Sequence, residues 1–203
     1  MMGRTPARSS TTGAQGCNMS TDLVRRAQAG DHDAFTALAA AAIARLHRTA
    51  RLILRDDERA GDAVQDALLQ AWLDIRAVRD PDRFEAWLNR VLVRSCYREA
   101  DRNRRRRSVE VPVESIDPAG DPGDGRAFAA RDQVDRGFRR LTPDQRAVLV
   151  VHHYLGLRDA EAADTLGIPE GTFKSRLSRA TGALRAAIEA DDRATGRAEE
   201  SVA

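Results

Sequence analysis

The sequence has few of the features that mark secreted, metal-binding or membrane proteins. Its two cysteines, Cys17 and Cys96, lie far apart and in no CxxC pair, which argues against a disulfide framework and a structural zinc site. Apolar runs are short compared with the roughly 18 to 20 residues that span a bilayer, and no charged segment leads into an apolar one at the start. We therefore expect a cytoplasmic protein with no membrane segment, metal or cofactor.

Motifs of catalysis are also missing. The chain contains no glycine-rich phosphate loop, nucleophile elbow or zinc-hydrolase motif. His152 and His153 are adjacent, so they cannot serve as metal ligands from one helical face. We predict that the protein is not an enzyme and has no small-molecule substrate.

Lysine is almost absent, since 32 of the 33 basic residues are arginine, and the net charge is only +2. That sum hides a segregation along the chain. Residues 1–107 carry 20 basic and 14 acidic side chains, residues 108–135 carry two and seven, and residues 136–190 carry nine and six. Biased codon usage explains arginine in place of lysine but not this clustering. Two basic blocks around an acidic one predict two polyanion-binding surfaces joined by a connector that does not adhere to them.

Apolar residues recur at three-and-four spacing in both basic blocks, which is typical of amphipathic helices. In the first block this spacing predicts a helix from Asp33 to Ile53, with Ile43 among its inward-facing residues. A second helix is expected after an N-cap at Asp57. A third helix is expected from Phe84 into the arginine run.

The chain is predicted to be all-α, with two small helical domains joined by a flexible acidic linker and a helix-turn-helix in the second domain. Prolines and glycines are dense in the acidic block, where they break both helix and strand. The expected boundaries are a disordered N-terminal tail over residues 1–18, a helical domain over 19–107, the linker over 108–135, a second helical domain over 136–190 and a disordered acidic tail over 191–203.

A helix-turn-helix is the most informative pattern in the second basic block. Thr142 is predicted to cap a helix, and Gln145 to close a capping box with it. Further on, a short helix over residues 159–166 is followed by Gly167, which supplies the positive φ of a tight turn. The next helix is expected to start at Pro169.

The second helix of this pair carries an apolar stripe on one side and hydroxyl and arginine side chains on another. Such a helix fits the DNA major groove, where an arginine fork reaches both acceptors of guanine. An ordinary two-helix hairpin with a solvated arginine face is the alternative. The candidate DNA-contacting residues are Thr172, Lys174, Ser175, Arg176, Ser178 and Arg179.

Two separate sets of motifs then resemble one family. Residues 167–185, GIPEGTFKSRLSRATGALR, are similar to a signature of the extracytoplasmic-function (ECF) group of the bacterial sigma-70 family, and residues 141–146, LTPDQR, resemble the opening of the same domain. In the first block, residues 62–72, DAVQDALLQAW, resemble the family helix that grips the clamp helices of the RNA polymerase β′ subunit. Residues 84–88, FEAWL, followed by Arg94, resemble the promoter-melting helix of the family.

The resemblance implies a promoter-specificity subunit. The second domain would read the −35 element, the first would capture and help to open the −10 element, and both would dock on core RNA polymerase, through the β′ clamp helices and the β flap. Promoter DNA and an anti-sigma factor are the other implied partners. The polymerase-binding residues would be Asp62, Gln65, Asp66 and Leu69, which share one acidic and apolar helical face; plain solvation of this face is the alternative.

The resemblance also implies that the loop over residues 76–83 cradles a base flipped from the −10 element. The arginine run that starts at residue 102 needs electrostatics alone, since each phosphate that it neutralises releases counterions; a solvated helix end is the alternative. The candidates for contacts with the −10 strand and with phosphates are Arg76, Arg79, Arg83, Asn89, Arg94, Arg102, Arg104, Arg105, Arg106 and Arg107.

Two other classes of protein stay open. A helix-turn-helix repressor or activator that acts without docking on core polymerase would bind palindromic half-sites as a symmetric dimer. An interaction module would have an inhibitor protein as its main partner. The promoter-specificity hypothesis itself would be contradicted by a single continuous hydrophobic interior that hides the arginine-bearing faces.

Overall fold

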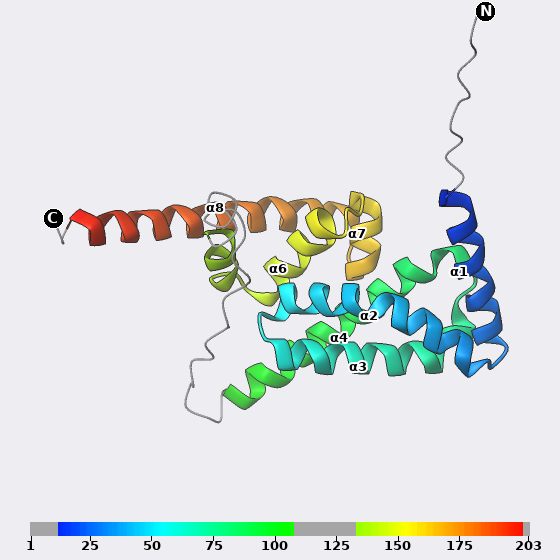
Figure 1. Ribbon diagram of the computed structural model, residues 1–203. Coiled ribbons are helices and arrows are strands. Elements are labelled where there is room, and N and C mark those ends of the chain that lie inside the picture. Colours follow the sequence, from blue (N-terminus) through cyan, green and yellow to red (C-terminus); the bar gives the residue numbers. More distant parts are fainter. Residues whose placement is uncertain (1–11, 108–132, 201–203) are drawn as a thin grey trace, which may run out of the picture.

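The structure, a computed structural model, describes residues 12–107 and 133–200, which we call the first and the second lobe (Figure 1). Within these two lobes there is no β-strand, and the predicted all-α class is confirmed. No helix in them is long and apolar enough to cross a membrane. The predictions for residues 1–11, 108–132 and 201–203 lie outside the described residues.

The first lobe consists of helices joined by short connections. Its elements are α1 (Thr12–Gln28), α2 (His32–Leu54), α3 (Asp57–Asp74), the 3-10 turns η1 (Ile75–Ala77) and η2 (Pro81–Arg83), and α4 (Phe84–Arg107). Helices α2 and α3 run antiparallel, and α4 packs against both (Figure 1). Helix α1 packs against α2 and the two turns at one end of the lobe.

The second lobe is smaller and ends in the longest helix. Its elements are a helical segment over residues 133–139, α6 (Pro143–Leu149), a π-helical turn η3 (Val150–Tyr154), α7 (Asp159–Leu166) and α8 (Glu170–Glu200). Helix α8 packs against α6 and α7. Its last turns project beyond the rest of the molecule (Figure 1).

The start of α3 corrects a prediction by one residue. Asp56, not Asp57, is the N-cap: its backbone is extended, and its carboxylate accepts a hydrogen bond from the Arg59 amide at 3.0 Å. Asp57 instead lies in the first helical turn, where the helix dipole favours a negative charge. Helix α2 ends at Leu54, and its C-cap Arg55, which precedes Asp56, takes the left-handed conformation with φ of 59°.

The local signals of the second lobe are confirmed. Thr142 accepts from the Gln145 amide at 3.3 Å while the Gln145 side chain accepts from the Thr142 amide at 3.0 Å, which is the predicted capping box. Helix α7 spans the predicted residues, and Gly167 follows it with φ of 67°. The next helix begins at Glu170 rather than at Pro169, whose carbonyl accepts the first hydrogen bond of α8.

Both terminal helices extend into segments that the sequence predicted to be disordered. Helix α1 begins at Thr12 and α8 continues to Glu200, so both helices include residues that the sequence analysis assigned to the tails. Once a packed segment has nucleated a helix, each further residue adds one hydrogen bond, and extension is easy. In α8 the extension is also anchored, since Asp191 pairs with Arg136 and with Arg140.

The two lobes share one hydrophobic interior. Buried residues of α2, α3 and α4 form a continuous cluster with buried residues of α6, η3, α7 and the first turn of α8. Val151 and Phe173 of the second lobe are fully buried in it together with Leu46 and Leu92 of the first. The lobes therefore pack against each other through apolar side chains, and the second lobe also has a smaller cluster of its own around Leu141, Leu149 and Ala180. The prediction that Ile43 faces inward was also wrong, because its side chain is 49% exposed.

Candidate nucleic-acid and polymerase interface

Helix α8 keeps its predicted polar face on the surface even though the lobes are packed together. Phe173 and Ala180 are fully buried on its inner side. Among the six DNA candidates, four are exposed and two are half-buried; the exposed ones are Lys174, Ser175, Ser178 and Arg179, and the half-buried ones are Thr172 and Arg176. The shared interior therefore does not hide this arginine-bearing face.

Hydrogen bonds within α8 hold several of these side chains along the helix. The Ser175 hydroxyl donates to the Thr172 carbonyl at 2.9 Å, and Arg179 Nε donates to the Ser175 carbonyl at 3.2 Å. Lys174 donates to Glu170 at 2.6 Å, and this hydrogen bond raises the pKa of Lys174. Arg176 and Arg179 line a shallow cavity with residues of α6. The face therefore offers two guanidinium groups one helical turn apart.

The first lobe presents a second cationic region around the turns that precede α4. Arg76, Arg79 and Arg83 are all exposed there. Arg94 is exposed on α4 itself, whereas Asn89 is only 6% exposed and accepts a hydrogen bond from Arg45 at 2.6 Å. The structure thus brings four of these five candidates to the surface and places Asn89 in the interior.

The arginine run at the end of α4 is partly neutralised by the protein. Arg102 donates to Glu99 at 3.1 Å and to Asp66 at 3.2 Å, and these hydrogen bonds raise its pKa. Arg104 pairs with Asp101 at 3.4 Å. Arg105 and Arg106 are exposed, and Arg107 is the last residue of the helix. The run therefore keeps exposed positive charge, with Arg102 held most firmly.

Helix α3 carries the predicted polymerase face and one residue that the prediction missed. Asp62 and Gln65 are exposed, and Asp66 is half-buried beside Arg102. Leu69 is 59% exposed, and Leu73, one turn further on, is 64% exposed. The signal for Leu73 was present, since it follows Leu69 at the four-residue spacing of one helical face.

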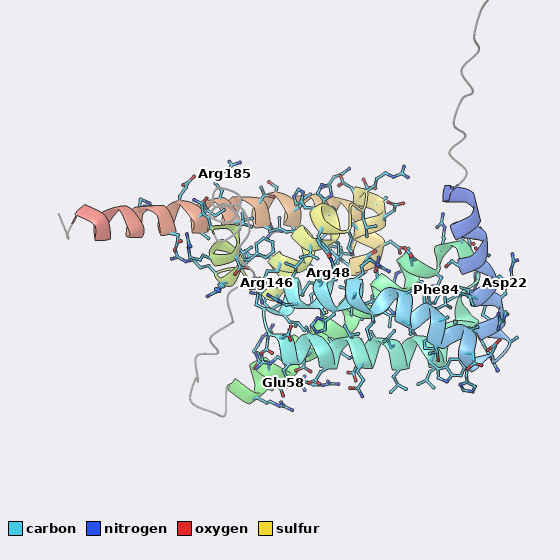
Figure 2. All side chains as sticks on the ribbon, viewed as in Figure 1. Asp22, Arg48, Glu58, Phe84, Arg146 and Arg185 are labelled. Atoms are coloured by element: carbon cyan, nitrogen blue, oxygen red, sulfur yellow. The ribbon has the colours of Figure 1, made fainter. Side chains whose placement is uncertain are left out.

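A third group of arginines, at the seam between the lobes, was missed entirely; Figure 2 labels one of them, Arg146. Arg146 is 7% exposed, and its Nε donates to the Ile53 carbonyl of the first lobe at 2.5 Å. Two ion pairs also cross the seam, Arg55 with Asp135 and Arg90 with Asp164. Burial raises the pKa of Asp135, but the hydrogen bond and charge of Arg55 outweigh it and lower the pKa overall. No local sequence signal identifies such residues, because their partners lie far away along the chain.

Comparison with protein families matches both lobes. The description "Sigma-70 region 2" matches residues 38–106, and "Sigma-70, region 4" matches residues 131–184. The chain is 37% identical over 164 residues to the ECF RNA polymerase sigma factor SigM of Mycobacterium tuberculosis (strain ATCC 25618 / H37Rv), covering 80% of this chain and 81% of that protein. It is 31% identical over 152 residues to the RNA polymerase sigma-E factor of Streptomyces coelicolor (strain ATCC BAA-471 / A3(2) / M145), covering 72% and 81%.

Solved structures show the same arrangement of helices. The structure of CnrH in complex with the cytosolic domain of CnrY has a TM-score of 0.59 and 28% identity, covering 85% of this chain and 99% of that one. The sigma factor RpoE in complex with the anti-sigma factor NepR from Bartonella quintana has a TM-score of 0.63 and 24% identity, covering 77% and 98%.

These likenesses define the class as helical, DNA-binding transcription initiation factors. Within that class, the chain belongs to the ECF group of the sigma-70 family.

Proposed function

We propose that this chain is an alternative sigma factor that binds core RNA polymerase, directs recognition of the −35 and −10 elements and so starts transcription. The carrying observation is that the basic face of α8 and the acidic and apolar face of α3 stay exposed although the lobes share an interior. The proposal includes no catalytic step by this chain. It places the chain in the cytoplasm, with the polymerase.

The −35 element is assigned to α8. Arg176 and Arg179 project from successive turns, so that both can enter one major groove, where an arginine fork pairs with guanine. Ser175 and Ser178 are exposed beside them and fit phosphate or base contacts. Thr172 and Lys174 lie one turn earlier and are assigned to the same groove.

The −10 element is assigned to the turns before α4 and to α4 itself. Arg76, Arg79 and Arg83 form a cationic rim that can follow the backbone of an opened strand. Arg94 extends this surface along α4. Asn89 is assigned a positioning role, because its amide oxygen already accepts from Arg45. The arginines from 102 to 107 are assigned further phosphate contacts.

Core polymerase is assigned to α3. Exposed leucines are costly on a free surface, and Leu69 and Leu73 lie one turn apart beside the carboxylate of Asp62 and the amide of Gln65. A partner helix that offers apolar and basic side chains would cover this face. By the same family assignment, the second lobe meets the β flap.

An inhibitor is a further proposed partner. The structure of CnrH, which this chain resembles at 28% identity, was solved with the cytosolic domain of CnrY bound. The faces assigned to polymerase are exposed in the free chain, so a protein that binds them first would block polymerase. We extend this to the present chain as an anti-sigma factor that competes for the exposed faces.

The direct test is association with purified core polymerase, followed by run-off transcription from a genomic library. The variant Leu69→Ser with Leu73→Ser should weaken association at least about tenfold, as for truncated interface anchors, while duplex affinity stays unchanged. Ile43→Ser, which alters an exposed apolar residue on α2, is the matched control. A footprint on duplex DNA that is unaffected by core polymerase would contradict the proposal and favour a polymerase-independent regulator.

A further inference from the structure

A cavity of about 460 Å³ lies at the seam, and both lobes contribute to its walls. The first lobe supplies Arg55 at the end of α2, Arg59 on α3 and Arg104 on α4. The second lobe supplies Arg139 and Arg146. Five arginines from five separate elements therefore line one partly open cavity, which is a different place from the DNA-candidate face of α8 and from the acidic and apolar face of α3.

Nearby carboxylates offset only part of this charge. Asp56 lies 3.2 Å from Arg59, Asp101 lies 3.4 Å from Arg104, and Asp135 pairs with both Arg55 and Arg139. Asp56 is further engaged as the N-cap of α3. Among the described residues, five arginines thus meet three aspartates around the cavity.

Arg146 differs from the other four arginines because its hydrogen-bond partners are backbone carbonyls and not carboxylates. Its Nε donates to the Ile53 carbonyl at 2.5 Å, and its Nη1 donates to the carbonyls of Leu141 at 2.8 Å and Phe138 at 3.3 Å. Within the described residues it has no carboxylate partner, and its Nη2 makes no hydrogen bond. Burial, together with the charge of Arg55, lowers the pKa of Arg146 to about 10. A buried guanidinium beside a second one is normally accompanied by a counter-ion.

We propose that this cavity binds a small phosphate anion, such as pyrophosphate or a free phosphate group, between the two lobes. Arginine forks are suited to phosphate oxygens, with which they form paired charge-assisted hydrogen bonds. The volume lies within the range of small-ligand sites, and a cluster of five arginines suits a multiply charged anion. Because the arginines come from both lobes, the anion also fastens the lobes to each other.

The test measures pyrophosphate binding to the full chain by calorimetry and by thermal unfolding, at constant ionic strength set with sodium chloride. Pyrophosphate should raise the unfolding midpoint above the value in sodium chloride alone. The double variant Arg59→Gln with Arg139→Gln should weaken binding about tenfold or more, since each lost charge-assisted contact is worth roughly a factor of ten. In this variant Asp56 also loses its Arg59 partner and repels the anion.

The matched control is Arg48→Gln with Arg185→Gln, which removes one exposed arginine from each lobe outside the cavity (Figure 2). It should bind pyrophosphate as the parent chain does. Each cavity variant is also made singly, and its helical content is checked by circular dichroism, so that loss of fold is not mistaken for loss of binding. Equal weakening in both double variants, or stabilisation no greater than that by sodium chloride, would overturn the proposal. The proposal would also be overturned if the cavity variants weakened the binding of a DNA duplex and left the binding of pyrophosphate unchanged.

Discussion

Arginines at the seam and arginines on the outer faces occupy opposite environments in this molecule. At the seam, Arg146 is buried and donates to three backbone carbonyls, and Arg55 pairs with Asp135 across the lobes. On the outer faces, Arg179 and Arg106 are exposed. One residue type therefore serves two purposes: the buried members hold two helical lobes together, while the exposed ones remain available to an outside polyanion. Burial, not sequence clustering, separates the two groups.

The strongest way to break this comparison is to remove a seam arginine. Arg146→Met keeps most of the side-chain volume but leaves the carbonyls of Ile53, Phe138 and Leu141 without their donor. We expect the free energy of unfolding to fall by about 3 kcal/mol or more, the scale for broken buried charged contacts. Urea unfolding measures it. Arg185→Met, at an exposed position on α8, should change the same quantity by less than about 0.5 kcal/mol. Similar small effects in both variants would show that the seam does not stabilise the fold.

Arg176 tests the outer group. Arg176→Ala should weaken discrimination of a −35 sequence against a scrambled duplex by about 1 to 3 kcal/mol, the worth of one bidentate arginine-guanine contact. The measurement is competitive duplex binding with holoenzyme. Arg185→Ala, further along the same helix, should leave discrimination intact. If both substitutions weaken specific and scrambled duplexes equally, α8 provides charge rather than sequence readout.

Tyr97 on α4 sharpens the comparison through pH. Burial chiefly, with the charge of Asp144 from the second lobe, raises the pKa of Tyr97 to about 12, while Arg176 opposes the shift. A folded-state pKa above the unfolded value means that stability is fully present below about pH 10 and is lost as the pH rises toward 12. Between pH 8 and pH 11 the parent chain should therefore lose about 1 kcal/mol relative to Tyr97→Phe.

The contribution of Cys96 does not disturb this measurement. Burial raises the pKa of Cys96 to about 12 as well, so its effect on alkaline stability has the same sign, but it is present in both proteins and cancels in the difference. Tyr154→Phe, at a position that is 43% exposed, is the matched control and should follow the parent chain. If the free energy of unfolding depends on pH in the same way for the parent chain and for Tyr97→Phe, then Tyr97 is not buried at the seam.

Short-range features of this fold were predictable from sequence, because their causes lie within a few residues. The capping box of Thr142 and Gln145, the bounds of α7 and the positive φ of Gly167 each depend on neighbours three or four positions away. The N-cap of α3 was misplaced by one residue, since two aspartates stand side by side there and either could cap. Helical spacing likewise identified the exposed face of α8.

Long-range features were not predictable, because nothing local encodes them. The hydrogen bond from Arg146 to the Ile53 carbonyl joins residues 93 positions apart. Hydrophobic periodicity does not reveal a buried arginine. In a chain with many arginines, each of them is predicted to be exposed. Ile43 shows that burial is equally hard to predict for an apolar residue. The apolar stripe of α2 is wide, and only the elements packed against it determine which of its residues stay exposed.

The smallest expected effect compares two arginines within one run. Arg102 already has two carboxylate partners, Glu99 and Asp66, whereas Arg106 is exposed near the end of α4. Each phosphate neutralised contributes about 0.9 to the slope of log K against log salt concentration for duplex DNA. Arg106→Gln should therefore make this slope for promoter binding less steep by nearly one unit. Arg102→Gln should change the slope by clearly less, because the charge of Arg102 is already partly neutralised by Glu99 and Asp66 within the protein. Titrations of promoter DNA at several salt concentrations give both slopes. A larger change for Arg102→Gln would mean that this residue exchanges its internal partners for a phosphate when DNA binds, and the division between internally engaged and outward-facing arginines would then fail at this end of α4.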